Sequence, residues 1–151
     1  MTERKVLIDS NILINAVKSE QAAQTDDQRD IIRQAKQRLR QVLTADDVAL
    51  VITPLVRYEV LRHSKDEQER ARLAQILQVI PVFEISREIG DLATRLYPLK
   101  VKVDMNANKY NFDIFHFATA KILDCEITTH DNGFAQLELI YSQLQANIEK
   151  I

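Results

Sequence analysis

Short runs of apolar residues alternate along this chain with longer segments in which apolar residues recur every three or four positions. The runs Val6–Ile8, Val48–Thr53 and Ile127–Thr129 contain many β-branched side chains, which predicts strands buried on both faces of a sheet. Because the segments between them have helical spacing, the pattern predicts an α/β protein with a mostly parallel sheet. Residues 1–151 contain no repeat or linker, so we expect one domain.

The spacing also predicts where most helices lie. Pro54 is expected at the first turn of a helix that carries Glu59, and Ser86 is expected to cap a helix that ends near Tyr97. Proline cannot donate to a sheet, so Pro81 predicts an edge strand over Val79–Phe83. The other expected elements are helices at Asn11–Val17, Asp30–Leu43, around Leu73–Leu77, Asp113–Leu123 and in the tail Ser142–Ile151, a turn-rich loop at Pro98–Asn111, and a short run at Leu137–Tyr141.

Composition and charge narrow the class of protein. An apolar share of 46% with mixed charges predicts a soluble globular protein, and no apolar stretch approaches the length that crosses a membrane. Glu3, Arg4 and Lys5 lead directly into the first strand, which is unlike a signal peptide, so we expect a cytoplasmic location. The lone Cys125 is interpreted as a small buried hydrophobe. The net charge of −2 provides no global attraction for nucleic acid.

Four carboxylates stand where acids are least expected, at the end of an apolar run or on an apolar stripe. Asp9 ends the first strand, Asp131 follows the last, Glu59 shares a helix face with Leu55 and Val56, and Asp113 begins an apolar helix. The carboxyl ends of parallel strands share one edge of a sheet. Two charges about 5 Å apart repel by roughly 3 kcal/mol at an effective dielectric near 20. A bound cation would relieve this repulsion, and oxygen-only ligands favour Mg²⁺ or Mn²⁺.

Each acid except Asp9 also has an ordinary structural interpretation. Asp113 and Asp131 are favourable in the first turn or at the cap of a helix, because of the helix dipole. Glu59 is equally well placed to pair with Arg57 or Arg62. Asp9, at a strand end, is the hardest to explain without a functional role.

Taken together, four segments resemble successive blocks of the PIN-domain nucleases, and most closely the VapC-like toxins of toxin–antitoxin pairs. They are VLIDSNIL from Val6, TPLVRYEVL from Thr53, DIFHFATA from Asp113 and TTHDNGF from Thr128. No single block is specific, but their order and spacing extend over nearly the whole chain. The region Lys18–Asp46 looks longer than in compact toxins.

The resemblance implies a PIN-like three-layer α/β/α sandwich, Mg²⁺- or Mn²⁺-dependent endoribonuclease activity, frequent homodimers and inhibition by a small antitoxin. By matched position, it implies that Asp9, Glu59, Asp113 and Asp131 are the catalytic acids and metal ligands. Ser10 and Asn11 would support them by hydrogen bonds to ligands or to metal-bound water.

Contacts to RNA are less clearly marked. Lys100, Lys102 and Lys109, near Tyr97 and Tyr110, are positioned to bind phosphate and stack a base, although a solvated loop is as good an interpretation. The basic side chains between Arg33 and Arg40 favour an exposed helix face over an RNA track.

Two rival functions stay open at this point. One is a PIN-fold module that binds RNA or protein without cutting it. The other is a phosphatase with an aspartyl nucleophile, although Asn11 stands where that chemistry usually has a second Asp. His116 is interpreted as a core or interface histidine rather than a site residue.

Overall fold

The structure is a computed structural model that describes residues 3–103, 111–128 and 133–149. The chain divides into two compact units, one of residues 1–84 and 125–129 and one of residues 85–124 and 130–151. We call them unit 1 and unit 2 and describe each by itself. The prediction of a single domain over residues 1–151 stays a prediction.

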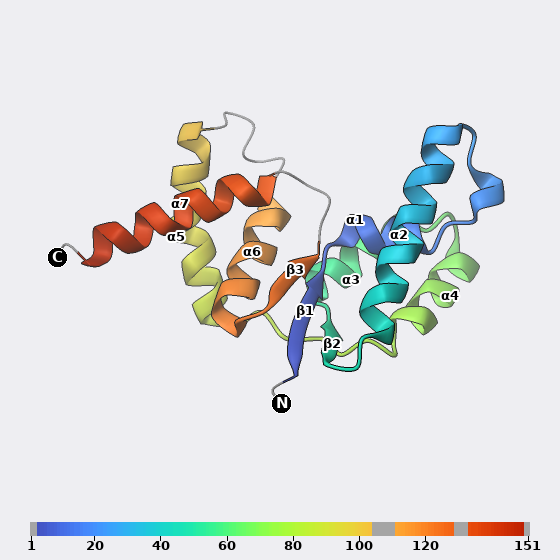
Figure 1. The fold of residues 1–151 in the computed structure, drawn as a ribbon, viewed down its shortest axis with the longest axis horizontal. Helices are drawn as coiled ribbons and strands as arrows, with labels where there is room; N and C mark the ends of the chain where they lie inside the picture. Colours follow the sequence, from blue (N-terminus) through green and yellow to red (C-terminus); the bar gives the residue numbers. More distant parts are fainter. Residues whose placement is uncertain (1–2, 104–110, 129–132, 150–151) are drawn as a thin grey trace. The chain divides into compact units, whose positions relative to one another are not determined.

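Unit 1 contains a parallel sheet of three strands in the order β2-β1-β3 (Figure 1). The strands are β1 (Arg4–Ile8), β2 (Val48–Val51) and β3 (Glu126–Thr128), and β1 pairs in parallel with both neighbours. Val6 and Ile8 point into the core of unit 1. Leu7 alternates to the other face and is only 1% exposed, so β1 is buried on both sides, as its continuous apolar run predicted.

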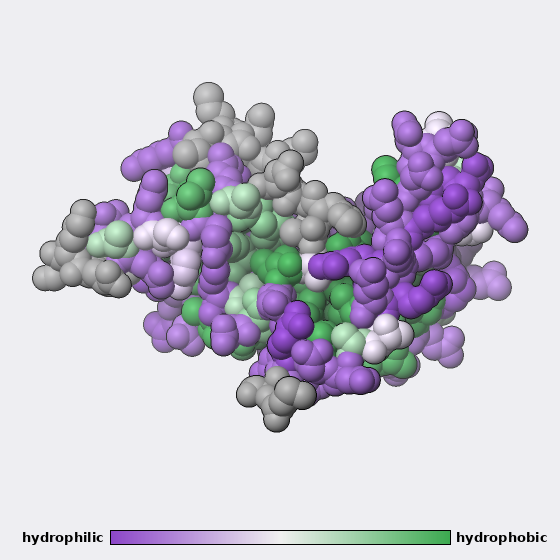
Figure 2. Space-filling view, in the orientation of Figure 1, coloured by the Kyte–Doolittle hydropathy of each residue, from purple (hydrophilic) through white to green (hydrophobic). Residues whose placement is uncertain are grey.

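The remaining elements of unit 1 are α1 (Ser10–Ala16), the 3-10 turn η1 (Glu20–Ala22), α2 (Asp26–Thr44), α3 (Pro54–Leu61) and α4 (Glu67–Leu77). Helix α2 starts four residues earlier than its apolar spacing predicted. The reason is a cap, because the Thr25 hydroxyl accepts a hydrogen bond from the Gln28 amide at 3.1 Å and Asp26 and Asp27 follow in the first turn. Figure 2 shows predominantly hydrophilic side chains over α2. No described helix is long and apolar enough to cross a membrane.

The predicted edge strand at Val79–Phe83 is reduced to a single parallel bridge between Ile52 and Val82. The Ile52 amide donates to the Pro81 carbonyl at 3.0 Å, and the Phe83 amide donates to the Ile52 carbonyl at 2.8 Å. Pro81 therefore contributes an acceptor only, which is the role that an edge position allows.

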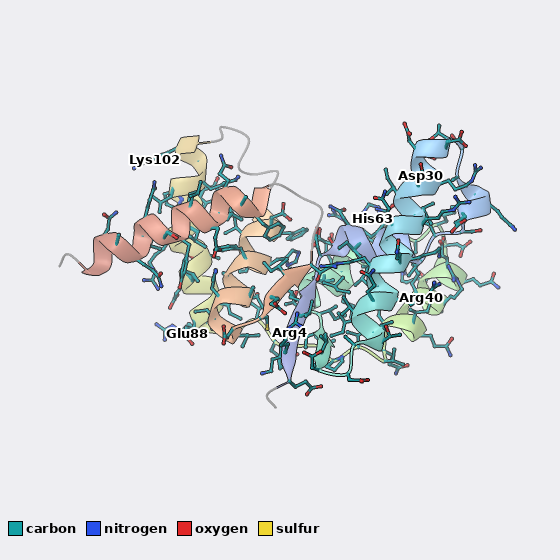
Figure 3. The ribbon with its side chains drawn as sticks, in the orientation of Figure 1. Arg4, Asp30, Arg40, His63, Glu88 and Lys102 are labelled. Atoms are coloured by element: carbon teal, nitrogen blue, oxygen red, sulfur yellow. The ribbon has the colours of Figure 1, made fainter. Side chains whose placement is uncertain are left out.

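Arg4 joins the beginnings of the three strands, and Figure 3 labels it at the start of β1. Its guanidinium donates to the Glu126 carboxylate of β3 at 2.8 and 3.0 Å and lies 3.5 Å from Asp47, just before β2. The hydrogen bond and charge of Glu126, with the charge of Asp47, raise the pKa of Arg4 above its ordinary value. This cluster lies at the amino ends of the strands, away from the predicted site.

Unit 2 is helical, with α5 (Arg87–Val103), α6 (Asn111–Leu123) and α7 (Gly133–Glu149). Helix α6 matches the predicted apolar helix, and the Ser86 hydroxyl caps α5 by accepting from the Ile89 amide at 3.2 Å. The run Leu137–Tyr141 and the predicted tail helix form one helix, α7, since Leu137 and Ile140 are both buried at helical spacing.

The loop predicted at Pro98–Asn111 is wrong at both ends, because α5 continues through Pro98 to Val103 and Asn111 begins α6. Residues 104–110 of this prediction lie outside the described residues. Figure 3 labels Glu88 near the start of this helix and Lys102 near its end. Leu96 is fully buried and Lys100 is 2% exposed. Burial of these flanking side chains, where α5 packs against α6 and α7, outweighs the local cost of a proline inside the helix.

Replacing Pro98 by Ala is therefore expected to raise the free energy of unfolding by about 1–2 kcal/mol. Alanine restores an amide that can donate to the carbonyl four residues earlier, and this gain exceeds the extra entropy of the unfolded chain. Urea denaturation followed by circular dichroism measures the change. A loss of stability in Pro98→Ala would mean that α5 needs the distortion that proline imposes.

Candidate active site at the carboxyl edge of the sheet

Asp9 follows the last residue of β1 and is 2% exposed. Its backbone connects strand and helix, because its amide donates to the Thr128 carbonyl of β3 at 3.1 Å and its carbonyl accepts from the Ile12 amide at 3.1 Å. The side chain makes no capping hydrogen bond to α1. These backbone bonds fix the Asp9 carboxylate at the carboxyl edge of the sheet.

Other polar side chains gather at this edge within unit 1. Ser10, Thr53 and Thr128 are at most 5% exposed and follow or end β1, β2 and β3 respectively. The Thr53 hydroxyl caps α3 by accepting from the Val56 amide at 3.2 Å. Sequence reasoning identified Ser10 but missed both threonines, although Thr53 stands just after β2 and Thr128 ends β3.

Asn11 is exposed at the start of α1, and its carbonyl accepts from the Asn15 side-chain amide at 2.9 Å. A supporting role for Ser10 and Asn11 stays a prediction.

Glu59 lies on α3, the helix that follows β2 and packs against α1. The prediction that it faces inward is only half met, because Val56 and Val60 are buried while Glu59 is half-buried at the boundary of the apolar face. A carboxylate at such a boundary can reach a ligand without full desolvation.

The other two predicted ligands are Asp113, which the structure describes, and Asp131. Asp113 is half-buried in the first turn of α6, in unit 2, a position that satisfies the helix-dipole interpretation as well as a ligand role. Asp131 lies outside the described residues. The convergence of Asp9, Glu59, Asp113 and Asp131 on one metal therefore stays a prediction.

The donor set fits a hard divalent cation. Asp9 provides a buried anionic oxygen donor, and the adjacent Ser10 and Thr128 add only oxygen atoms. Within residues 3–103, 111–128 and 133–149, no three His, Cys, Asp or Glu side chains are close enough to hold a metal by themselves. A complete shell would need water, backbone or residues beyond the described ranges.

The three lysines that the sequence marked for RNA contact do not share one environment. Lys100 is 2% exposed, and its ammonium donates to the Gln136 side chain of α7, which favours a structural role in unit 2. Lys102 is exposed at the end of α5, and Lys109 lies outside the described residues. His116, at 1% exposed on α6, is the core histidine that was expected.

A separate groove of about 600 Å³ lies between the helices of unit 1. Ile32 and Val60 contribute apolar walls, and Lys18, Lys65 and Arg72 are basic residues of its lining. Neither Asp9 nor Glu59 lines it, so the groove is distinct from the carboxylate site.

The basic side of α2 is partly neutralised by its own neighbours. Arg29 pairs with Asp26 at 2.9 Å, and Arg33 pairs with Glu20 of η1 at 3.0 Å. Lys36 donates to the Ala16 carbonyl at the end of α1 at 2.6 Å. These contacts agree with the interpretation as an exposed helix face.

Comparison with known proteins agrees with this architecture. A family model described as the PIN domain matches residues 6–139. A toxin–antitoxin complex from Klebsiella pneumoniae is similar with a TM-score of 0.58, 23% identity, and coverage of 83% of this chain and 86% of that chain. VapBC2 from Rickettsia felis, bound to a DNA fragment from its promoter, is similar with a TM-score of 0.58, 16% identity, and coverage of 87% and 92%.

No curated protein matches the sequence significantly. At these identities the two solved structures support the fold alone. With the family match, they confirm the predicted fold class, the PIN-like α/β/α sandwich with a parallel sheet.

Proposed function

The chain belongs to the PIN domain family, and from this we propose that it is a metal-dependent endoribonuclease, a VapC-like toxin that a cognate antitoxin inhibits. The single observation that carries the proposal is the buried Asp9 carboxylate at the carboxyl end of the central strand. Open α/β sheets place their sites at this edge. A buried carboxylate is an oxygen ligand of the kind that Mg²⁺ and Mn²⁺ prefer, and a bound cation offsets the cost of burying its charge.

The proposed roles follow from how firmly each side chain is held. Asp9, fixed by backbone bonds to β3 and α1, is the central ligand. Asp113 is the second ligand, while Glu59 and Asp131 complete the shell directly or through water, and one of them orients the attacking water. Ser10 and Asn11 would hold these groups in place by hydrogen bonds.

A bound Mg²⁺ or Mn²⁺ supplies a more acidic water and neutralises charge on the phosphate. The protein side chains hold the carboxylates in position and orient the water toward phosphorus. Since the nucleophile is water, the ribose 2′-hydroxyl takes no part in the cleavage.

Cleavage of single-stranded RNA is therefore expected to require added Mg²⁺ or Mn²⁺ and to stop in excess EDTA. The products should carry 5′-phosphate and 3′-hydroxyl ends, which end-labelling after phosphatase treatment identifies. A 2′,3′-cyclic phosphate product, or activity that persists in EDTA, would reject this mechanism.

The two rival functions predict different results. A non-cleaving PIN module would bind RNA and leave it intact at every metal concentration. Calorimetry that shows no Mn²⁺ binding would also favour this module over the nuclease. An aspartyl phosphatase would hydrolyse a small phosphate ester, which the proposed nuclease should leave untouched.

The partners follow from the same proposal. The similar solved structures are toxin–antitoxin complexes, which supports a small antitoxin protein as a partner. The groove of unit 1 offers apolar walls and a basic lining for a segment with apolar and acidic side chains. We further propose a homodimer that acts in the cytoplasm.

A further inference from the structure

Helix α3 presents an aromatic ring to solvent beside a guanidinium. Tyr58 is 54% exposed, and the Arg62 guanidinium carbon lies 5.6 Å from the centre of its ring. The two residues are four positions apart on the helix, so they occupy the same side. Cation–π contact of this kind orients both groups.

A single exposed tyrosine is common on protein surfaces and does not by itself indicate a binding site. Here the ring is joined to a cation and stands one residue before Glu59, a proposed metal ligand. Arg62 follows Glu59 by three positions and Tyr58 by four, so it lies between the carboxylate and the ring along the helix surface. By helical spacing Arg62 is therefore a surface neighbour of both the ring and the acid, and we call these three residues a strip of α3.

The chemistry of this strip fits one nucleotide of a single-stranded nucleic acid. An aromatic face stacks any base, and a guanidinium binds phosphate oxygens in a bidentate fork. The chain has a net charge of −2, so a polyanionic substrate must be held by local contacts of this kind. Arg57, also exposed on α3, adds a further positive charge to the same helix.

We propose that Tyr58 and Arg62 form a base-stacking platform that holds one nucleotide of single-stranded RNA next to the cleavage site. Tyr58 stacks on the base, and Arg62 contacts the adjoining phosphate. The inference rests on the proposed function for the identity of the nucleic acid, and it assigns a residue pair for substrate positioning.

The test measures binding separately from cleavage. The protein carries Asp9→Asn to block hydrolysis, and the probe is a fluorescein-labelled pool of 12-nucleotide single-stranded RNA of random sequence with Mg²⁺ present. Tyr58→Ala is expected to weaken binding by about 5- to 150-fold, the usual range for loss of one aromatic–base stack. Tyr58→Phe should bind as the parent does, because stacking does not need the hydroxyl. Tyr58→Leu should bind as weakly as Tyr58→Ala.

A second probe separates the base from the phosphates. A 12-mer that keeps the ribose-phosphate backbone but lacks bases should bind the Tyr58→Ala protein and its parent equally. Arg62→Ala should weaken the binding of both probes. It should also reduce the slope of log affinity against log salt concentration by about 0.7, the value for one phosphate contact on a single strand. RNA with internal 2-aminopurine should lose fluorescence on binding only when residue 58 is aromatic.

The control is Leu139→Ala, which removes another exposed apolar side chain, 67% exposed, from α7 of unit 2. It should leave RNA affinity unchanged. Equal affinity of Tyr58→Ala and its parent, an equal loss in Leu139→Ala, or no binding of RNA by the parent would each overturn the platform. Absence of metal-dependent cleavage in the unmutated protein would instead overturn the nuclease proposal, with the Tyr58 result still readable from binding.

Discussion

Asp9→Asn is expected to lower RNA cleavage at least about 10³-fold, because a neutral amide replaces the anionic oxygen of the proposed central metal ligand. Loss of several kcal/mol of charge stabilisation in the transition state corresponds to a factor of this size. The measurement is single-turnover cleavage at saturating protein with Mg²⁺ or Mn²⁺. Residual activity near the unmutated rate would remove Asp9 from the catalytic site.

The same substitution should not unfold the protein. Asparagine keeps the shape of the buried side chain and removes a charge whose desolvation costs several kcal/mol, whereas the favourable position near the N-terminus of α1 contributes about 0.3–1 kcal/mol. The melting temperature without metal is therefore expected to be equal or higher. A large fall would indicate that Asp9 acts mainly as a structural residue.

Metal provides an independent readout on stability. Mn²⁺ at about 100 times its dissociation constant should stabilise the unmutated protein by about 2.7 kcal/mol, and it should have little effect on Asp9→Asn. The matched control is Asp46→Asn, since Asp46 is exposed in the turn before β2. This control should keep both cleavage and the metal-dependent shift.

Ile8→Ala is expected to lower the free energy of unfolding by about 3–4 kcal/mol, because it removes three carbon atoms from a fully buried position. Ile8 is 0% exposed, lies in the central strand and belongs to the core of unit 1. Small domains have a total stability of about 5–15 kcal/mol, so this single change would consume a large part of it. Urea unfolding monitored by circular dichroism gives the value.

The control for this prediction is Ile31→Ala on α2. Ile31 is 51% exposed, and alanine is the better helix former, so its unfolding free energy should stay within about 0.5 kcal/mol. Equal effects at the two positions would contradict the assignment of Ile8 to the core. Asp9 follows Ile8 directly. Ile8→Ala is therefore also expected to lose cleavage at temperatures at which the destabilised β1 begins to unfold.

Much of the fold was predictable from local pattern. The last three residues of β1, Val6–Ile8, are all apolar and begin and end with a β-branched residue. Pro54 after Thr53 marks a helix start with its cap. Both signals act over a few residues and do not depend on distant contacts. They predicted Asp9 at the end of β1 and Glu59 on the helix that begins at Pro54, and the structure agrees.

The errors occurred where distant packing overrides a local signal. Pro98 predicted a loop, yet burial of Leu96 and Lys100 against α6 and α7 carries α5 to Val103. Likewise, two short apolar runs near the end of the chain became one helix because Leu137 and Ile140 are buried together. A local pattern contains no information about which neighbours will cover a face.

The sequence alone therefore determined the order of the elements and the parallel sheet, because apolar periodicity and capping are encoded within a few positions. It also supplied the residues of the proposed site. Only the tertiary structure decided that Asp9 is buried while Glu59 is half-buried, that Lys100 is held inside unit 2, and that Tyr58 stands in solvent beside Arg62. Burial depends on what packs against a side chain from distant parts of the chain.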